Sequence, residues 1–326
     1  MSKRKLYIFL LLPLSLALIM LLVGCGNTYA GLTTRWLAQG EQETSFYEQA
    51  TYDLTHKTVT NKEGLAFTLT SGTLTQTIQG ANRAIENALI NNGTATNYNS
   101  YEYKTELTIN GQYTYHGQAT EVKDTITSTV LCRISTEGFR PLKSTQIIKA
   151  TTPEYNAKTK TYTFTKYDYT VDKLYNGDTN TVEIHTTANN NSTSVENSVK
   201  TVSNINKKNA PYDSVQLYFV ARAMQDATNI VNTITENGIV PTIINLSTGK
   251  EKLTFPNTTE EKEFATTNAK ISIAGNGIGK GPGRILTFLT SGDFRHTLYR
   301  VQETMPYSLG AIIYTLKTIT KTPLTP

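Results

Sequence analysis

The stretch YEYKTELTINGQYTYHGQATEV, Tyr101 to Val122, carries the clearest fold signal in the chain. Apolar and polar side chains alternate along it, with Tyr101, Tyr103, Leu107 and Ile109 on one face. A period of two is typical of a β-strand, and an Asn-Gly pair such as Asn110-Gly111 favours a tight hairpin turn. We therefore predict a β-hairpin that turns at Asn110-Gly111.

Similar alternation continues on both sides of this stretch. Strand-like runs begin with YEQATYDLTHKTV at Tyr47 and continue through KDTITSTVLCRIST and KTYTFTKYDYTV to SLGAIIYTLKTI near the end of the chain. Turn signals such as Asn176-Gly177-Asp178 separate them. Regularly spaced strands of this kind predict a meander of antiparallel strands.

Two segments depart from the alternation. Within Leu74 to Asn91, apolar residues recur every three or four positions, which predicts a helix, although its Thr-rich start leaves a strand open. From Asp213 to Met224 the pattern predicts a second helix, apolar on nearly all sides, with Asp213 as its cap and Arg222 as the charge in its middle. The expected fold is mainly β: a curved antiparallel sheet or half-barrel with one or two packed helices.

The N-terminus is typical of an exported protein. Three basic residues precede an apolar run from Leu6 to Val23, which is the pattern of a secretory signal. The sequence Leu22-Val23-Gly24-Cys25 resembles the bacterial lipobox, which implies cleavage before Cys25 and acylation of its thiol; an uncleaved anchor and an ordinary signal peptide are the alternatives. We expect a signal peptide at 1–24, a lipidated tether at 25–50 and a single β-rich domain at 51–326.

Composition excludes some classes of function. Lys3, Arg4 and Lys5 lie in the signal, which leaves 28 basic against 26 acidic residues, so we expect no nucleic-acid partner. Cys132 is the second of two cysteines, so we expect a buried thiol in a strand and no disulfide framework.

No catalytic or metal-binding motif stands out. The four histidines are spread along the chain without ligand spacing, so we expect no metal and no cofactor, and a Gly-rich stretch from Ala274 to Arg284 lacks the Lys-Ser/Thr step of a phosphate-binding loop. Asp293, Arg295 and His296 form a polar cluster that we interpret as a turn between strands; a ligand-facing cluster is the alternative.

Two motifs in the C-terminal half resemble the bacterial exported domain-of-unknown-function family numbered 3108. The first lies in YDSVQLYFVARAM and the second between Gly283 and Leu316; the matching residues are Asp213, Ser214, Leu217, Tyr218, Arg222, Gly283, Arg284, Asp293, Arg295, Pro306, Gly310, Ile312 and Leu316. In this chain, His296-Thr297 replaces the proline that follows the arginine in that family. The resemblance implies a fold more than a role, because the family's function is unknown.

These observations favour a non-catalytic lipoprotein on the extracytoplasmic face of the cell envelope, in the outer membrane if the cell has two. The first hypothesis is a binding or carrier module that takes a lipid or another apolar ligand on the concave face of the sheet. Its expected ligand-binding residues are Tyr101, Tyr103, Tyr162, Phe164, Tyr218, Phe219 and Arg222. The alternative is a structural or assembly lipoprotein that acts through contacts with envelope proteins.

Overall fold

The computed structural model describes residues 47–81, 99–135, 138–177, 179–190, 192–203, 205, 211–224, 226–254, 261–273, 283–290 and 296–321. They form one 15-stranded sheet and very little helix, so the fold is mainly β as predicted. The strands are β1 (Tyr47–His56), β2 (Leu65–Ala81), β3 (Asn99–Tyr115), β4 (Gln118–Ser135), β5 (Gly138–Asn156), β6 (Thr161–Asn176), β7 (Thr181–Ala188), β8 (Ser198–Val202), β9 (Tyr212–Asp213), β10 (Thr228–Thr235), β11 (Gly238–Thr254), β12 (Glu261–Ile273), β13 (Arg284–Leu289), β14 (Leu298–Thr304) and β15 (Ala311–Lys321). The helical elements are α3 (Leu217–Val220), η4 (Ala221–Ala223) and η5 (Pro306–Ser308).

The sheet is a meander in two halves. The chain runs from β1 in the middle outward to β8 at one edge, and then from β9 at the other edge back to β15 in the middle. Its order is β8-β7-β6-β5-β4-β3-β2-β1-β15-β14-β13-β12-β11-β10-β9. All neighbours pair antiparallel except the short β9, which pairs parallel with β10. The first and last strands, β1 and β15, therefore lie side by side at the centre, and the chain crosses from one end of the sheet to the other between β8 and β9.

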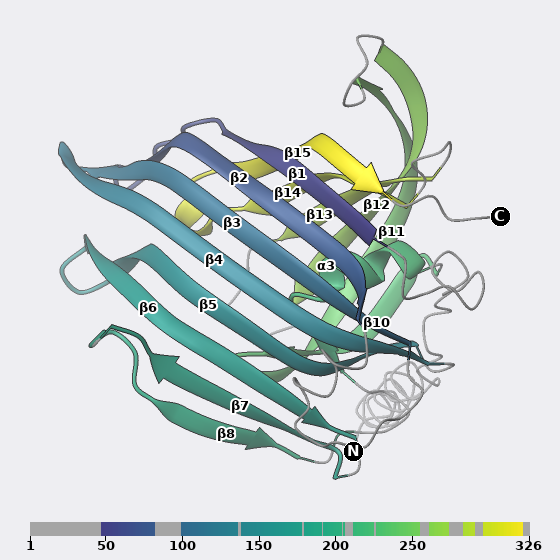
Figure 1. The fold of residues 1–326 in the computed structure, drawn as a ribbon. Helices are drawn as coiled ribbons and strands as arrows, with labels where there is room; N and C mark the ends of the chain where they lie inside the picture. The colour runs from purple at the N-terminus through teal and green to yellow at the C-terminus, as the bar shows by residue number, and fades with distance from the viewer. Residues whose placement is uncertain are drawn as a thin grey trace, which may run out of the picture.

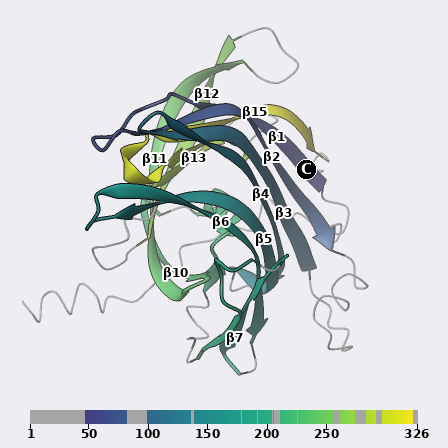
Figure 2. The same ribbon diagram turned by 90° about the vertical axis from the view of Figure 1, so that its left-hand side faces the viewer.

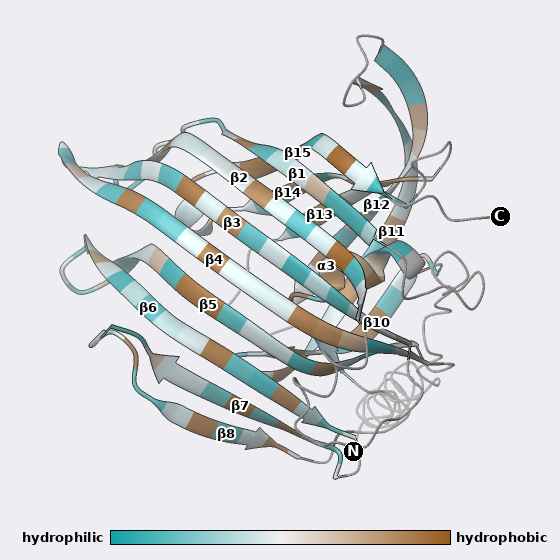
Figure 3. Ribbon diagram, viewed as in Figure 1, coloured by the Kyte–Doolittle hydropathy of each residue, from teal (hydrophilic) through white to brown (hydrophobic). Residues whose placement is uncertain are grey.

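The sheet is strongly curved, as predicted. Strands β1 to β8 form one wall, β10 to β13 face them across the interior, and α3 lies between the two walls (Figures 1 and 2). Because β9 at one end of the sheet contacts β5 near the other, the sheet closes most of the way into a barrel. Hydrophobic and hydrophilic residues alternate along the strands, which is the pattern of a sheet with one buried face (Figure 3).

The hairpin turn predicted at Asn110-Gly111 is wrong. Strand β3 continues through both residues, and the chain turns at His116 and Gly117, whose φ angles are 48° and 76°. Gly111 is required for close packing instead: a Cβ there would lie 2.5 Å from the carbonyl oxygen of Thr68 and 3.0 Å from Cζ of Phe67. The turn at Asn176-Gly177 is confirmed, since β6 ends there and pairs with β7.

The helices are shorter than predicted. Residues Leu74 to Ala81 belong to strand β2, and the rest of the first predicted helix, through Asn91, lies outside the described residues. The second helix is reduced to α3 and η4, because Tyr212 and Asp213 are drawn into a parallel bridge with β10. Its predicted burial is confirmed: Leu217, Phe219 and Val220 are buried.

The N-terminal signal and Cys25 lie outside the described residues. The sheet itself begins at Tyr47, so residues 47–50, which we expected to end the tether, pair with β2 and β15. No helix in the described part of the chain has the length and apolar character to cross a membrane.

Candidate functional site

The interior of the half-barrel, around α3 and η4, contains most of the predicted ligand-binding residues. Tyr101, Tyr103 and Phe219 are each 0% exposed, and the rings of Tyr103 and Phe219 stack with their centroids 5.9 Å apart. Tyr218 packs against the same core. These aromatic side chains contact other side chains of the protein, so in this structure α3 occupies the position that we expected a ligand to take.

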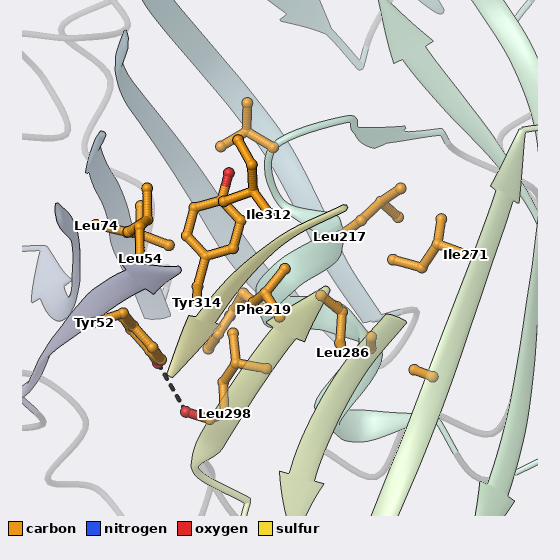
Figure 4. Close-up of a cluster of buried hydrophobic side chains, with 14 of the residues drawn as sticks. Tyr52, Leu54, Leu74, Leu217, Phe219, Ile271, Leu286, Leu298, Ile312 and Tyr314 are labelled. Carbon is orange, nitrogen blue, oxygen red and sulfur yellow. Dashed lines mark hydrogen bonds between the residues drawn. The ribbon is translucent and has the colours of Figure 1, made fainter. Parts of the chain in front are cut away.

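Both walls contribute to this core. Leu217 and Phe219 of α3 lie among apolar side chains from β1, β2 and the C-terminal strands, which include Tyr52, Leu54, Leu74, Ile271, Leu286, Leu298, Ile312 and Tyr314 (Figure 4). The Tyr52 hydroxyl donates a hydrogen bond at 2.8 Å to the Leu298 carbonyl of β14, two strands away in the sheet. The α3 segment thus joins the two walls.

A buried ion pair lies at the centre of this region. The Arg222 guanidinium is 2.8 Å from the Glu48 carboxylate of β1, with both side chains almost wholly buried, at 0% and 2% exposed. The guanidinium also lies 5.9 Å from the centroid of the Phe219 ring. Arg222 was predicted to contact a ligand; here it joins η4 to the central strand of the sheet.

Tyrosine hydroxyls surround the ion pair. Burial raises the pKa of Tyr52 and Tyr103, and the positive charge of Arg222 opposes that rise only in part. Both hydroxyls therefore stay protonated at neutral pH. The Tyr103 hydroxyl and the Gln76 amide nitrogen are buried, and neither has a hydrogen-bond partner among the described residues. The buried ion pair and the buried Tyr103 and Gln76 groups make this core more polar than apolar packing alone requires.

A second polar network lies on the C-terminal wall. Arg284, at the start of β13, donates from Nε to Glu303 at 2.8 Å, and the Tyr314 hydroxyl donates to the same carboxylate at 3.0 Å. The Arg284 guanidinium lies 5.3 Å from the centroid of the Tyr218 ring. Tyr218 is therefore held by a cation–π contact on one side and by the core on the other.

A third network closes the barrel where its ends meet, and we call this region the seam. The Asp213 carboxylate of β9 accepts hydrogen bonds from Lys173 at 2.9 Å, Ser144 at 2.6 Å and Tyr175 at 2.7 Å. Lys173 and Asp213 are both 0% exposed. Burial and the Asp213 carboxylate raise the pKa of Tyr175, so its hydroxyl remains a donor. A small apolar cluster of Val171, Val182, Ile184 and Ile234 packs beside it.

Tyr162 and Phe164 lie in an aromatic group at another part of the same hydrophobic core. Phe164 stacks on Tyr113 with centroids 5.5 Å apart, and Tyr162 contacts Tyr115 and Tyr307 edge-on. Asn61, in the loop between β1 and β2, donates to the Tyr162 hydroxyl at 2.9 Å. The predicted aromatic ligand-binding residues therefore all belong to one core, some beside α3 and some in this aromatic group.

Of the predicted polar cluster, Asp293 and Arg295 lie outside the described residues. His296 is described: its backbone has a φ of 66°, and its amide donates to the Leu289 carbonyl. This hydrogen bond joins the end of β13 to the segment that leads into β14, which fits the predicted turn between strands. Within the described residues, no group of three or more histidine, cysteine, aspartate or glutamate side chains is placed to hold a metal ion.

Cys132 is a buried strand thiol, as predicted. It is 0% exposed, and its sulfur lies 3.5 Å from the Tyr101 carbonyl oxygen. Burial raises the pKa of this thiol to about 12. At neutral pH it is therefore protonated and a poor nucleophile.

Sequence reasoning missed Glu48 and Lys173. Each is a charged residue at an inward position of an alternating strand. In β1, Glu48 shares its face with the buried Ala50, and in β6, Lys173 shares its face with Val171 and Tyr175. A lone charge at an inward position is a signal for a buried partner, because an unpaired charge is costly to bury.

No family model matches the chain, and no curated protein matches its sequence. The resemblance to the family numbered 3108 therefore stays a prediction. A crystal structure described as a β-barrel-like protein of domain of unknown function DUF1849, from Brucella abortus, is similar over 85% of this chain and 98% of that one, with a TM-score of 0.45 and 10% identity.

Proposed function

We propose that the protein is a non-catalytic lipoprotein of the cell envelope whose folded domain works through contacts with other envelope proteins. The observation that supports this most is the filled interior. Tyr101, Tyr103 and Phe219, which would line a ligand cavity on the concave face, are fully buried against one another and their neighbours. A domain whose concave face is filled around α3 is expected to meet protein partners with its outer surface.

The outer face of β5 to β8 offers candidate contact positions. Ile147, Leu174 and Val199 point outward there, by the register of the paired strands, and are 43%, 41% and 68% exposed. They stand among polar residues such as Thr170 and His185. Isolated apolar groups in a polar surround suit a contact between soluble domains.

Photo-crosslinking in the producing cell tests this proposal. A photoreactive residue at Ile147 or Leu174 should give a discrete crosslinked protein, while the same residue at Ile148, which is inward on β5, should give none. If neither outward position crosslinks while the protein remains in its membrane, contact through this face is wrong.

Anchoring through Cys25 is the second part of the proposal. The lipobox resemblance supports it, and acylation would leave Cys132 as the single thiol of the mature chain. A thiol reagent should label none in the native protein, because Cys132 is buried, and one after unfolding. Two labelled thiols after unfolding would show a free Cys25 and contradict lipidation. A Cys25→Ser variant should also leave the membrane fraction.

A lipid carrier is the second candidate, and one observation favours it. The core contains a buried charge pair, Glu48 and Arg222, and a buried Tyr103 hydroxyl without a partner among the described residues. If α3 moved aside, these groups could hold the polar head of an amphipathic ligand. Native mass spectrometry of the protein extracted from its own membrane separates the candidates: a stoichiometric lipid beyond the covalent anchor supports the carrier, and a bare mass supports the contact protein.

A further inference from the structure

One part of the concave face is open. At the seam, the inward side of β6 to β8 faces the turn between β10 and β11, and a cleft of about 420 Å³ lies between them. We call it the seam cleft. It is lined by Tyr167, Tyr169, Ile184, Thr186, Ser198 and Lys200 from the strands, by Ser194, Val195 and Glu196 from the loop before β8, and by Glu236 and Asn237 from the turn. Its volume lies within the range of small-molecule sites.

Two tyrosine rings form an aromatic corner in this cleft. The rings of Tyr167 and Tyr169 are 6.3 Å apart and nearly perpendicular, at 72°. Each hydroxyl is held by a carboxylate: Tyr167 donates to Glu154 at 2.5 Å, and Tyr169 donates to Glu236 at 3.0 Å. Because these bonds fix the hydroxyls, the two rings are held in place before any ligand arrives, which lowers the entropic cost of binding.

The polar groups of the cleft are mixed in kind and nearly balanced in charge. Lys200 supplies a positive charge and donates to the Asn237 carbonyl, while Glu196 and Glu236 supply negative charges. Thr186, Ser194 and Ser198 add hydroxyls that both donate and accept. An anion would meet the carboxylates, and a cation would meet Lys200. A ligand that is neutral and rich in hydroxyls can use both kinds of partner.

Aromatic walls complete the argument. The faces of a sugar ring carry C–H groups, which pack well against the electron-rich face of a tyrosine. From the aromatic corner and the balanced rim together, we propose that the seam cleft binds a neutral glycan. The cleft is separate from the α3 core, so this inference stands whether or not the proposed function does.

Titration calorimetry on the full-length protein tests the inference. The protein is purified in a zwitterionic detergent, because a detergent with a sugar head group would compete for the site. The probes are a tetramer of N-acetylglucosamine and a tetramer of glucose, both neutral, and a tetramer of glucosamine, which is positively charged. We expect saturable binding of at least one neutral tetramer, with a dissociation constant on the order of 1 mM or tighter.

Variants assign the binding to the cleft. Tyr167→Ala should weaken binding at least about 10-fold, whereas Tyr167→Phe, which keeps the ring and loses only the hydrogen bond to Glu154, should weaken it less. Glu236→Gln should weaken it less than Tyr167→Ala, since the Tyr169 hydroxyl keeps an acceptor. The matched control is Tyr155→Ala, which removes a tyrosine that is 36% exposed and lies outside the cleft.

Any one of four results would overturn the inference. The first is an absence of binding for both neutral tetramers to the wild-type protein. The second is tighter binding of the charged tetramer than of the neutral ones, which would assign the cleft to a cation. The third is an equal loss in Tyr155→Ala and Tyr167→Ala. Near-ultraviolet circular dichroism shows whether each variant keeps its packing. If Tyr167→Ala loses its packing, the test passes to Glu236→Gln and Lys200→Gln, and the fourth result is unchanged binding in both of them.

Discussion

At the scale of single residues, Gly111 shows how the absence of a Cβ lets two strands pack closely. A Cβ at this position would meet the Thr68 carbonyl oxygen at 2.5 Å and the Phe67 ring at 3.0 Å, and the first of these is backbone that cannot rotate away. We predict that Gly111→Ala lowers the free energy of unfolding by about 1–3 kcal/mol. Gly177→Ala is the control, because nothing lies within 4 Å of its added Cβ. Equal melting temperatures for the two variants would contradict this account.

Asp124 is a residue whose ionisation opposes folding. Burial raises the pKa of its carboxyl to about 6, although the Thr151 amide donates to it at 2.8 Å. Since the folded pKa lies above the unfolded one, the protonated form is favoured in the folded state, and stability falls as the pH rises from about 4 to about 6. The folded state therefore carries an ionised, partly buried carboxylate at neutral pH.

We predict that Asp124→Asn stabilises the protein at pH 8 by about 1 kcal/mol, after allowance for solvent screening, and leaves it unchanged near pH 4. The asparagine oxygen can still accept the Thr151 hydrogen bond. Thermal unfolding at both pH values measures the effect. Asp53→Asn, at an exposed ion pair with Lys317, should show no such gain at pH 8. A variant that is less stable than the wild type at pH 8 would refute the prediction.

At the scale of elements, the sequence predicts strands better than their ends. Alternation predicted the strand up to Ile109 and its inward Tyr101 and Tyr103, because a period of two survives wherever one face is buried, but it did not predict that β3 continues to Tyr115. Segment Leu74 to Ala81 was ambiguous for a physical reason. Leu74 and Ile78 are four residues apart, a spacing that places them on one face of a helix and equally on one face of a strand. The buried Gln76 between them concealed the alternation.

The candidate site was harder to predict, because its charges pair across distant segments. Arg222 stood out as a charge within an apolar run, but its partner Glu48 lies on β1, and only the curvature of the sheet brings them together. Likewise, Asp213 was expected to cap a helix. Its carboxylate does accept a hydrogen bond from the Val215 amide. It also accepts hydrogen bonds from side chains of β5 and β6, and these hold the seam together. Local patterns do not encode such contacts.

The attachment of η4 to β1 leads to a second stability prediction. Arg222→Met keeps much of the side-chain volume but leaves Glu48 buried without its main partner, so we expect a loss of about 3–5 kcal/mol. Adding Glu48→Gln should recover part of that loss, because the buried carboxylate is removed, while Lys321, 3.8 Å from Glu48, loses this ion pair. Lys317→Met, which breaks the exposed pair with Asp53, should cost less than about 1 kcal/mol. A double variant no better than Arg222→Met alone would show that lost packing, and not charge, explains the effect.

At the scale of the whole molecule, the fold depends on how its two ends are joined. The sheet has free edges at β8 and β9, and edges left open invite pairing with other chains. Here the ends meet through side chains: Lys173, Ser144 and Tyr175 hold Asp213, and Tyr169 reaches Glu236 in the opposite turn. Among the described residues, a polar contact and a small apolar cluster thus close the barrel, and no continuous ladder of backbone hydrogen bonds joins its two ends.

This mode of closure predicts that the seam can be opened without unfolding the centre of the sheet. Lys173→Met leaves Asp213 buried with three neutral donors, Ser144, Tyr175 and the Val215 amide, and no cation, at a cost of about 3–5 kcal/mol. Hydrogen exchange should then rise in β6 to β10, on both sides of the seam, while β1 and β15 keep their protection because they lie at the centre of the sheet. Adding Asp213→Asn should restore part of the protection.

The control is Lys250→Met, which breaks an exposed pair with Glu263. A uniform rise in exchange through β1 and β15 as well would mean that the seam and the central strands unfold as one cooperative unit.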